Sequence, residues 1–388
     1  MKTSVTIGAL VFVIAFSYTF ATMHFVPETK VAFLKENFSR LASQQASVVE
    51  ASHEEQSVPK APNTVNEVIE VKPESIYLPA NMVWKVATTS AEWTARDSAA
   101  SFVFNGKLWI MGGINGNGVE TNLEHGVHYW QATHYNDIWS SVDGVTWKSE
   151  AEHAEWAERR SMSVIVFQDK LWMFAGWSPV DGYVNDVWQS TDGIHWKRIL
   201  EHAPFAVREG QTAEVFQGKI WMMGGVNYDR RKVYNDVWSS PDGIHWKEAT
   251  ATAPWSPRWD HALAVFHDKF FLTGGMDLSQ NTFNDVWSSL DGITWEHIDA
   301  TPWPTRQGHG LLNYKDALWI VGRLNDDVGG GINDVWYSLD GKLWEKTKED
   351  PGWIGREDHQ SIIFDDHIYI FSGMDANWHW MNDVWRLE

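Results

Sequence analysis

The sequence predicts an all-β fold, a β-propeller of six blades with four antiparallel strands in each blade. Its strongest sign is the phrase Asn-Asp-x-Trp, which returns every 49 or 50 residues. Self-similarity at that period indicates supersecondary units that are stacked or arranged around an axis. Between the copies lie short runs rich in Val, Ile, Phe and Trp, separated by tight polar turns, which is typical of hairpins. The copies begin at Asn136, Asn185, Asn235, Asn284, Asn333 and Asn382.

The two ends of the repeat region predict how the ring closes. The last unit stops soon after its Asn-Asp-Val-Trp, whereas the first unit is preceded by an unmatched strand around Trp84. We therefore expect the strand around Trp84 to pair with the strand that contains Trp385 and to complete the last blade. Such a clasp covers two sheet edges that would otherwise be exposed.

Each unit is expected to contain four strands, a to d, in chain order. Strands a and b surround a turn such as Asn-Gly-Lys, strand c carries Asn-Asp-x-Trp, and strand d carries the Trp that follows Asp-Gly. Asp-Gly favours a type I′ turn, in which both central residues need a positive φ. The a–b and c–d turns then share one face of the disc. The variable b–c and d–a connections share the other face, where a rigid scaffold places recognition.

Residues 1–27 are interpreted as a signal peptide or an N-terminal membrane anchor. The segment Ile7–Phe16 is strongly apolar, and no charged residue follows Lys2 until Glu28. Small residues suit cleavage after Ala21, but the uncharged stretch is also long enough to cross a bilayer. Both alternatives place the bulk of the protein outside the cytoplasm, as a periplasmic or secreted protein or one attached to a membrane by its N-terminus.

The repeat signals are absent from residues 28–78. This segment is polar and acidic, which is typical of a flexible spacer. The predicted propeller then occupies residues 79–388, and we expect it to be monomeric.

The charge and the cysteine content exclude several classes of function. The formal net charge is −20, with 31 Lys and Arg against 51 Asp and Glu. That balance disfavours nucleic acid as a partner, because phosphate binding relies on basic surfaces. Without cysteine there is no disulfide, thiolate zinc site or cysteine nucleophile. His125 and His128 are close in sequence but lack a third ligand at a recognisable spacing, so we expect no metal and no cofactor.

The repeat resembles a known family. Paired glycines after strand b, a variable loop and a spaced Trp, in a unit of about 50 residues, resemble the kelch repeat. The resemblance runs from about Asn81 to Glu388 and implies a kelch-type propeller. The kelch family also includes galactose oxidase, whose copper centre depends on a tyrosine crosslinked to cysteine. A chain without cysteine cannot form that centre.

One arginine stands at the start of the inner strand of every blade, and three of these arginines are followed by histidine at the third position. Kelch units commonly show both residues. They are interpreted either as internal partners of the Asp in Asn-Asp-x-Trp or as a cationic ring at the mouth of the axial channel, suited to a carboxylate. These ligand-binding candidates are Arg96, Arg159, Arg208, Arg258, Arg306, Arg356, His261, His309 and His359.

Aromatic side chains in the variable loops complete the ligand-binding candidates. An aromatic ring in such a loop can stack on a sugar ring. The candidates are Trp130, Tyr228, Trp378 and Trp380. Together with the arginines below them, they make an acidic sugar the first ligand class to test.

Two functions of different classes follow. In the first, the protein is an exported binding module that takes a glycan or an envelope or surface protein on its variable face, without chemistry. In the second, it is similar to the six-bladed periplasmic kelch enzymes that equilibrate anomers of sialic acid, where an acid/base carboxylate and an arginine serve the sugar acid. The candidate catalytic residues are Glu209, Glu357 and Arg356. The regularity of the blades favours the binding module.

Overall fold

The computed structural model describes residues 82–388, apart from 118–120, 123–125, 128–130, 299–300, 326–329 and 349. The predicted signal or anchor, the spacer, Trp130, His125 and His128 therefore lie outside the described residues. Every named secondary-structure element in the described part is a β-strand. The described residues contain no helix with the length and apolar character of a membrane span. The propeller belongs to the compact unit Glu74–Glu388.

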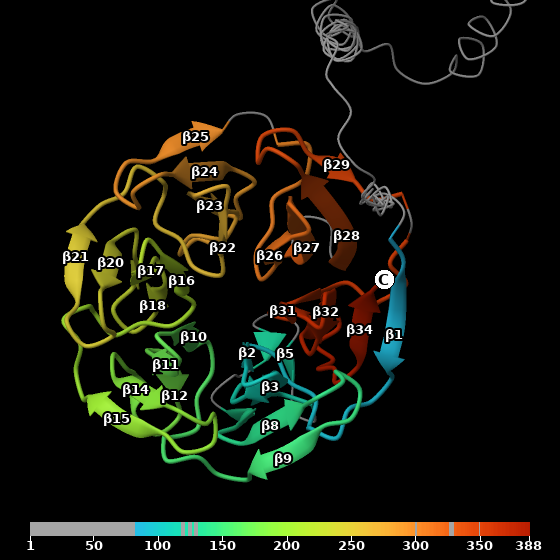
Figure 1. The fold of residues 1–388 in the computed structure, drawn as a ribbon, viewed down its shortest axis with the longest axis horizontal. Helices are drawn as coiled ribbons and strands as arrows, with labels where there is room; N and C mark the ends of the chain where they lie inside the picture. The colour runs from blue at the N-terminus through green and yellow to red at the C-terminus, as the bar shows by residue number, and fades with distance from the viewer. Residues whose placement is uncertain are drawn as a thin grey trace, which may run out of the picture. The chain divides into compact units, whose positions relative to one another are not determined.

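Six four-stranded antiparallel sheets surround a central axis, as Figure 1 shows in a view along that axis. This confirms the predicted fold class, with strands a to d running from the axis outward. Blades one to three are β2 (Ala100–Phe104), β3 (Lys107–Met111), β8 (Ile138–Ser141) and β9 (Lys148–Ala151); β10 (Ser163–Phe167), β11 (Lys170–Phe174), β14 (Val187–Ser190) and β15 (Lys197–Leu200); and β16 (Thr212–Phe216), β17 (Lys219–Met223), β20 (Val237–Ser240) and β21 (Lys247–Thr250).

The other three blades follow the same plan. They are β22 (Ala262–Phe266), β23 (Lys269–Thr273), β24 (Val286–Ser289) and β25 (Glu296–Ile298); β26 (Gly310–Tyr314), β27 (Ala317–Asn325), β28 (Gly330–Ser338) and β29 (Glu345–Lys346); and β31 (Gln360–Phe364), β32 (His367–Phe371), β34 (Val384–Leu387) and β1 (Trp84–Thr88). Two-stranded pairs stand on the variable connections: β4 (Ile114–Asn115) with β7 (Thr133–His134), β5 (Thr121–Asn122) with β6 (Gly126–Val127), β12 (Trp177–Ser178) with β13 (Gly182–Tyr183), β18 (Val226–Asn227) with β19 (Lys232–Val233), and β30 (Arg356–Glu357) with β33 (Met374–Asp375).

The N-terminal strand closes the ring. Strand β1 pairs antiparallel with β34, with Trp84 opposite Leu387 and Val86 opposite Trp385. In Figure 1 the blue strand β1 lies against the red strand β34, at the outer edge of the last blade. The predicted clasp is confirmed, and the first and last segments of the propeller share one sheet.

The repeated phrase ties strand c to the connection that leaves its blade. In the third blade, Asn235 Nδ2 donates hydrogen bonds to the carbonyls of Ala253 and Trp255 at 2.9 and 3.2 Å. Trp238 Nε1 donates to the carboxylate of Asp236 at 2.8 Å. Buried backbone carbonyls need such partners. The phrase recurs because every blade needs the same bonds.

The pair of positive φ values that a type I′ turn requires is found in the a–b turns, whereas the sequence predicted it for the Asp-Gly turns. At an Asp-Gly turn only the glycine has a positive φ, 75° at Gly243, so that prediction was wrong. The Asp242 carboxylate instead accepts hydrogen bonds from the two N–H groups after the glycine, at 2.9 and 2.8 Å. An aspartate can cap a turn in this way without a positive φ of its own. The a–b turns do have two successive positive φ values, 51° at Gln168 and 58° at Asp169.

Each Asp-Gly glycine also touches the neighbouring blade. A Cβ placed on Gly243 would lie 2.5 Å from the ring of Trp172, and one on Gly292 would lie 2.6 Å from the ring of Trp221. Only glycine fits, because it supplies the positive φ and lets the backbone approach the aromatic ring. The same residue therefore shapes the turn and joins two blades.

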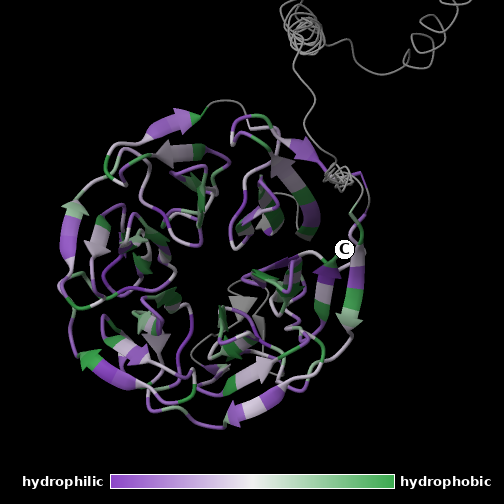
Figure 2. Cartoon of the chain, in the orientation of Figure 1, coloured by the Kyte–Doolittle hydropathy of each residue, from purple (hydrophilic) through white to green (hydrophobic). Residues whose placement is uncertain are grey.

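Edge-to-face aromatic pairs fill the boundaries between blades. Their ring centroids are 4.5 to 6.2 Å apart, a geometry worth about 0.5–1.5 kcal/mol per pair beyond the buried area. The pairs are Trp93 with Trp147, Phe205 with Trp246, Trp255 with Trp295, Trp303 with Trp344, and Trp353 with Trp84. The outermost strands are largely hydrophilic in Figure 2, so the apolar core lies between the blades and toward the axis.

Candidate functional site

Every arginine at the start of an inner strand pairs with the aspartate of Asn-Asp-x-Trp in its own blade. Both terminal nitrogens of Arg258 lie 2.7 Å from the carboxylate oxygens of Asp285, and Nη1 also donates to the carbonyl of Gly274 at 2.7 Å. The six arginines are at most 1% exposed. The pairs are Arg96 with Asp137, Arg159 with Asp186, Arg208 with Asp236, Arg258 with Asp285, Arg306 with Asp334, and Arg356 with Asp383.

These ion pairs match the first of the two interpretations of the arginines, in which each one is an internal partner of the aspartate in Asn-Asp-x-Trp. Burial alone would raise the pKa of Asp285, but the hydrogen bonds and the charge of Arg258 outweigh it, and the pKa is lowered. Each guanidinium is thus neutralised by its own carboxylate. A direct role of the arginines in ligand binding stays a prediction, and the accessible chemistry lies nearer the axis.

The residue two positions after each arginine belongs to a closed ring of backbone hydrogen bonds, here called the axial ring. The N–H of Asp358 donates to the carbonyl of Gly308 at 3.0 Å, and the N–H of Ser98 donates to the carbonyl of Asp358 at 3.2 Å. Four equivalent bonds of 2.8 to 3.3 Å complete the circle. The ring consists of Ser98, Ser161, Gly210, Asp260, Gly308 and Asp358. All six blades are therefore bonded to one another at the axis.

The axial ring has a local conformational cause. All six of its residues have φ between 48° and 64°, the left-handed region that glycine enters freely and that small polar residues tolerate. In the sequence this position holds only Ser, Gly or Asp. That restricted choice, two residues after each arginine, was the signal that the sequence reasoning missed.

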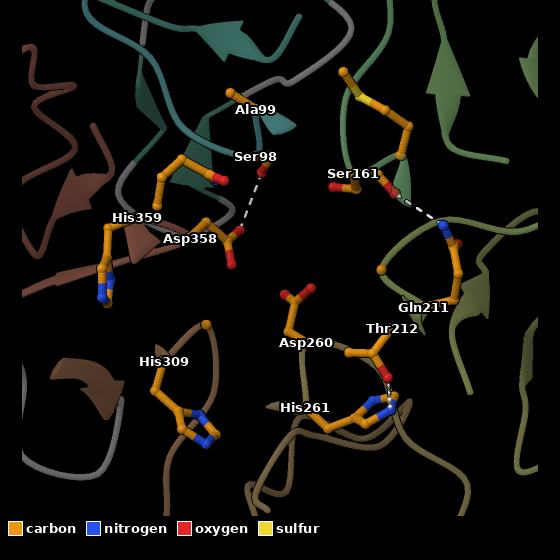
Figure 3. Close-up of a pocket in the computed structure, with 14 residues that line it drawn as sticks. Ser98, Ala99, Ser161, Gln211, Thr212, Asp260, His261, His309, Asp358 and His359 are labelled. Atoms are coloured by element: carbon orange, nitrogen blue, oxygen red, sulfur yellow. Dashed lines mark hydrogen bonds between the residues drawn. The ribbon is translucent and has the colours of Figure 1, made fainter. Parts of the chain in front are cut away.

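A cavity of about 160 Å³ lies inside the axial ring. The ring residues line it, together with the start of each inner strand, including Gln211, Thr212 and His309. Figure 3 shows the carboxylates of Asp260 and Asp358 directed into this cavity, and Ser98 Oγ donates to the Asp358 carboxylate at 3.1 Å. Glycine at the third and fifth ring positions leaves room beside the two carboxylates. We call this space the axial pocket.

A second set of charged side chains lies at the sequence position between a buried arginine and its axial-ring residue. Nε and Nη2 of Arg160 donate to the two carboxylate oxygens of Glu209, at 2.9 and 3.2 Å. Gln307 donates to Glu357 at 3.1 Å, and Asp97 is 2% exposed. Backbone bridges join this position to the b–c loops, as between Glu209 and Val226, so these residues lie next to the variable face.

The carboxylates of the axial pocket are held in an unfavourable environment. Burial first, and then repulsion by Glu209, raise the pKa of Asp358 to about 6, although Ser98 and Arg160 oppose the shift. Burial and the charge of Asp358 raise the pKa of both Asp97 and Asp260 well above the usual value. The site therefore holds more carboxyl groups than Arg160 can compensate, and each of the three keeps its proton to a higher pH than usual.

The three predicted histidines line the axial pocket but carry no charge at neutral pH. Burial lowers the pKa of His261 and His359 to about 3, and lowers that of His309 as well. Nε2 of His261 lies 2.8 Å from the hydroxyl of Thr212. A Cβ on Gly224 would lie 2.5 Å from the His261 ring, so this histidine also fills the space beside the preceding blade.

The predicted loop aromatics separate into two groups. Tyr228 is 40% exposed and stands edge-to-face on Trp259, with ring centroids 5.5 Å apart. Its N–H donates to the hydroxyl of Tyr183 at 3.1 Å, and its pKa is raised by burial and then by Asp260 and Glu209. Tyr183, Tyr228 and Trp259 form what we call the aromatic rim, two members of which the sequence reasoning missed.

The other two described candidates belong to the last blade. Trp380 is 4% exposed and packs against Met374, and a Cβ on Gly116 would lie 2.4 Å from its ring. Trp378 is half-buried, with a φ of 61°. Trp380 therefore acts in packing, while stacking of Trp378 on a sugar stays a prediction. Among the described residues, no group of three or more His, Asp or Glu is arranged to hold a metal ion.

Comparison with known proteins identifies the repeat. The family model of the KLHDC2/KLHL20/DRC7 kelch-repeats domain matches residues 75–275, slightly more than half of the chain. No curated protein matches the sequence. A solved structure titled "Structure of YjhT" is similar, with a TM-score of 0.59 and 16% sequence identity over 77% of this chain and 96% of that one. At that identity the likeness shows the fold alone. With six blades and a family match over half its length, this chain belongs to the KLHDC2/KLHL20/DRC7 kelch-repeats domain family.

Proposed function

We propose that this chain is a binding module that takes a glycan or a surface protein on the face bearing the b–c and d–a connections. The axial pocket carries this proposal, because it is a cavity lined by residues of all six blades, at the starts of the inner strands where the d–a connections arrive. Propellers combine such a rigid centre with loops that differ between blades. The aromatic rim adds apolar surface beside the polar pocket, as a sugar ring requires.

A glycan array with the full chain tests the proposal. The test variant is Asp260→Asn with Asp358→Asn, since asparagine keeps the side-chain shape and tolerates a left-handed φ. The matched control is Asp169→Asn with Asp268→Asn, which makes the same change at left-handed positions in exposed a–b turns. We expect binding that is lost in the test variant and kept in the control. Binding that survives in both variants would place the ligand elsewhere.

The proposal includes export from the cytoplasm. It rests on the apolar segment Ile7–Phe16, preceded by Lys2 and followed by an uncharged stretch up to Glu28. An exported propeller would meet glycans and surface proteins as its nearest partners. Whether the segment is removed or kept as an anchor is a separate question with its own experiment.

A second candidate function is equilibration of sugar-acid anomers, of the sialic acid type. It is favoured by Asp358, a carboxyl group in the axial pocket whose pKa of about 6 suits proton transfer near neutral pH. Arg160, which is bound to Glu209, acts on the charge of Asp358, whereas Arg356 is buried against Asp383. An NMR mutarotation assay with sialic acid decides the matter. Accelerated exchange that is lost in Asp358→Asn supports the enzyme, and exchange at the uncatalysed rate rejects it.

A further inference from the structure

We propose that the axial pocket binds a primary ammonium group carried by the ligand. This deepens the proposed function and rests on it, since the ammonium is expected to enter from the variable face. The observation behind it is the excess of carboxylates at the axis. The earlier expectation of an acidic sugar depended on open arginines, whereas the six predicted arginines are buried on their own aspartates.

The charges near the axis are distributed unevenly. Asp260 and Asp358 face the cavity in Figure 3, and the electrostatic neighbours of Asp260 include Glu209 and Glu357. The cation that acts on Asp97, Asp260 and Asp358 is Arg160, which already binds both oxygens of Glu209. A cleft lined by one sign of charge and walled by apolar blades concentrates its field, and here it attracts cations.

An independent observation points to a ligand that donates hydrogen bonds. Gln211 lines the cavity and is 6% exposed. Its Nε2 donates to Ser163 Oγ at 2.9 Å, while its Oε1 has no hydrogen-bond partner within the described structure. A buried acceptor left without a donor is costly. An ammonium group offers three donors and no acceptor, which suits the two aspartates that face the cavity and an amide oxygen that lies buried in its wall.

The size and the donor set favour an organic cation over a metal ion. The cavity of about 160 Å³ has room for more than a single atom. No group of three or more His, Asp or Glu within the described residues has the arrangement of a metal site. Ser98, Ser161 and Thr212 add hydroxyl groups to the wall. The aromatic rim, with Tyr228 beside Asp260, provides a place for the carbon atoms next to the ammonium.

Binding of the ammonium group must release protons. Burial and then repulsion by Glu209 raise the pKa of Asp358 to about 6, and burial and then repulsion by Asp358 raise the pKa of Asp260 well above the usual value. A bound cation favours the ionised carboxylates and lowers both pKa values. Affinity should therefore increase with pH through about 6, by about tenfold from pH 5 to pH 7 if one proton is released near that pKa.

Titration calorimetry of the full chain with n-butylammonium chloride tests the inference. At constant ionic strength we expect binding at pH 7, about tenfold weaker binding at pH 5, and none of n-butanol. The Asp260→Asn, Asp358→Asn variant should lose at least tenfold in affinity, while the Asp169→Asn, Asp268→Asn control keeps it. Thermal melting confirms that both variants fold, and the pH dependence of the wild type tests the inference without any variant. Equal affinity for butylammonium and butanol would overturn it, as would affinity unchanged in the pocket variant.

Two further arms identify the source of the amine. Glucosamine is compared with N-acetylglucosamine, and Nα-acetyl-lysine amide with its Nε-acetylated form. Preference for the free amine in either pair supports the inference, and the tighter of the two free amines identifies the carrier as sugar or protein. Equal binding of free and acetylated forms overturns it. If the glycan array shows binding that depends on the axial pocket while no amine binds, the ammonium inference fails and the binding function stands.

Discussion

The backbone N–H of Ser98 donates a hydrogen bond to the carbonyl of Asp358, and the Ser98 hydroxyl donates to the carboxylate of the same residue. The two residues are 260 positions apart in the chain. Their contact closes the axial ring between the first and the last blade. In addition, the hydroxyl of Ser98 in the first blade orients the Asp358 carboxylate of the last blade, which faces the cavity. Closure of the ring therefore also forms part of the pocket wall.

The N-terminal clasp should be a large source of stability. Trp84 is 8% exposed and stands edge-to-face on Trp353, so we expect Trp84→Ala to lower the free energy of unfolding by about 3–5 kcal/mol. Val86→Ala is the matched control, because Val86 lies on the same strand but is 47% exposed, and should cost within about 0.5 kcal/mol. Urea unfolding measures both. Deleting residues 81–88 should lower the melting temperature further, and unchanged melting would contradict the clasp.

The close approach at the Asp-Gly turns can be separated from their positive φ. Gly292→Ala meets the ring of Trp221 at 2.6 Å and has a φ of 72°, whereas Gly218→Ala has a φ of 71° with nothing within 4 Å. Gly218→Ala should cost about 1–2 kcal/mol from the backbone alone. Gly292→Ala should cost about 1–3 kcal/mol more. Equal losses in chemical denaturation would show that the aromatic contact is unimportant.

The axial carboxylates should lower stability at neutral pH. A carboxyl group whose pKa is raised by folding stabilises the protein below its unfolded pKa, and that contribution is lost as the pH rises through the folded pKa. For Asp358 the loss should begin near its ordinary pKa of about 4 and be nearly complete at its folded pKa of about 6. The Asp260→Asn, Asp358→Asn variant should therefore melt higher than the wild type at pH 7 and close to it at pH 4. For Asp358 alone the gain is up to about 3 kcal/mol.

Melting curves at several pH values, each compared with the Asp169→Asn, Asp268→Asn control, test this effect. A variant that is less stable than the wild type at pH 7 would mean that the two carboxylates hold the ring together, contrary to the repulsion inferred here.

The N-terminal segment should direct export. Residues 1–30 fused to a reporter that is active only outside the cytoplasm should give activity, because the segment combines Lys2 with the apolar Ile7–Phe16. A shortened soluble product would indicate cleavage after Ala21, and a full-length product extracted with the membrane would indicate an anchor. Activity confined to the cytoplasm would reject both.

The sequence alone determined the architecture of the blades. Six copies of Asn-Asp-x-Trp, the spaced tryptophans and the unmatched strand around Trp84 were enough, since each is a local pattern that must repeat wherever the same blade is built. The type I′ assignment to Asp-Gly failed for an equally local reason. The aspartate side chain satisfies two backbone donors, and the turn then needs a positive φ only at the glycine.

Only the tertiary structure decided what the axis contains. From the sequence, the arginines could pair either with the aspartate of Asn-Asp-x-Trp or with a carboxylate of a ligand. The structure shows the first arrangement: Arg258 and Asp285 are 27 residues apart and meet inside one blade. Asp260 and Asp358 are 98 positions apart and read as ordinary turn residues, but ring closure places both at one cavity. Charge repulsion and burial act on side chains in space, so the acidic character of the site existed only once six distant segments had met around the axis.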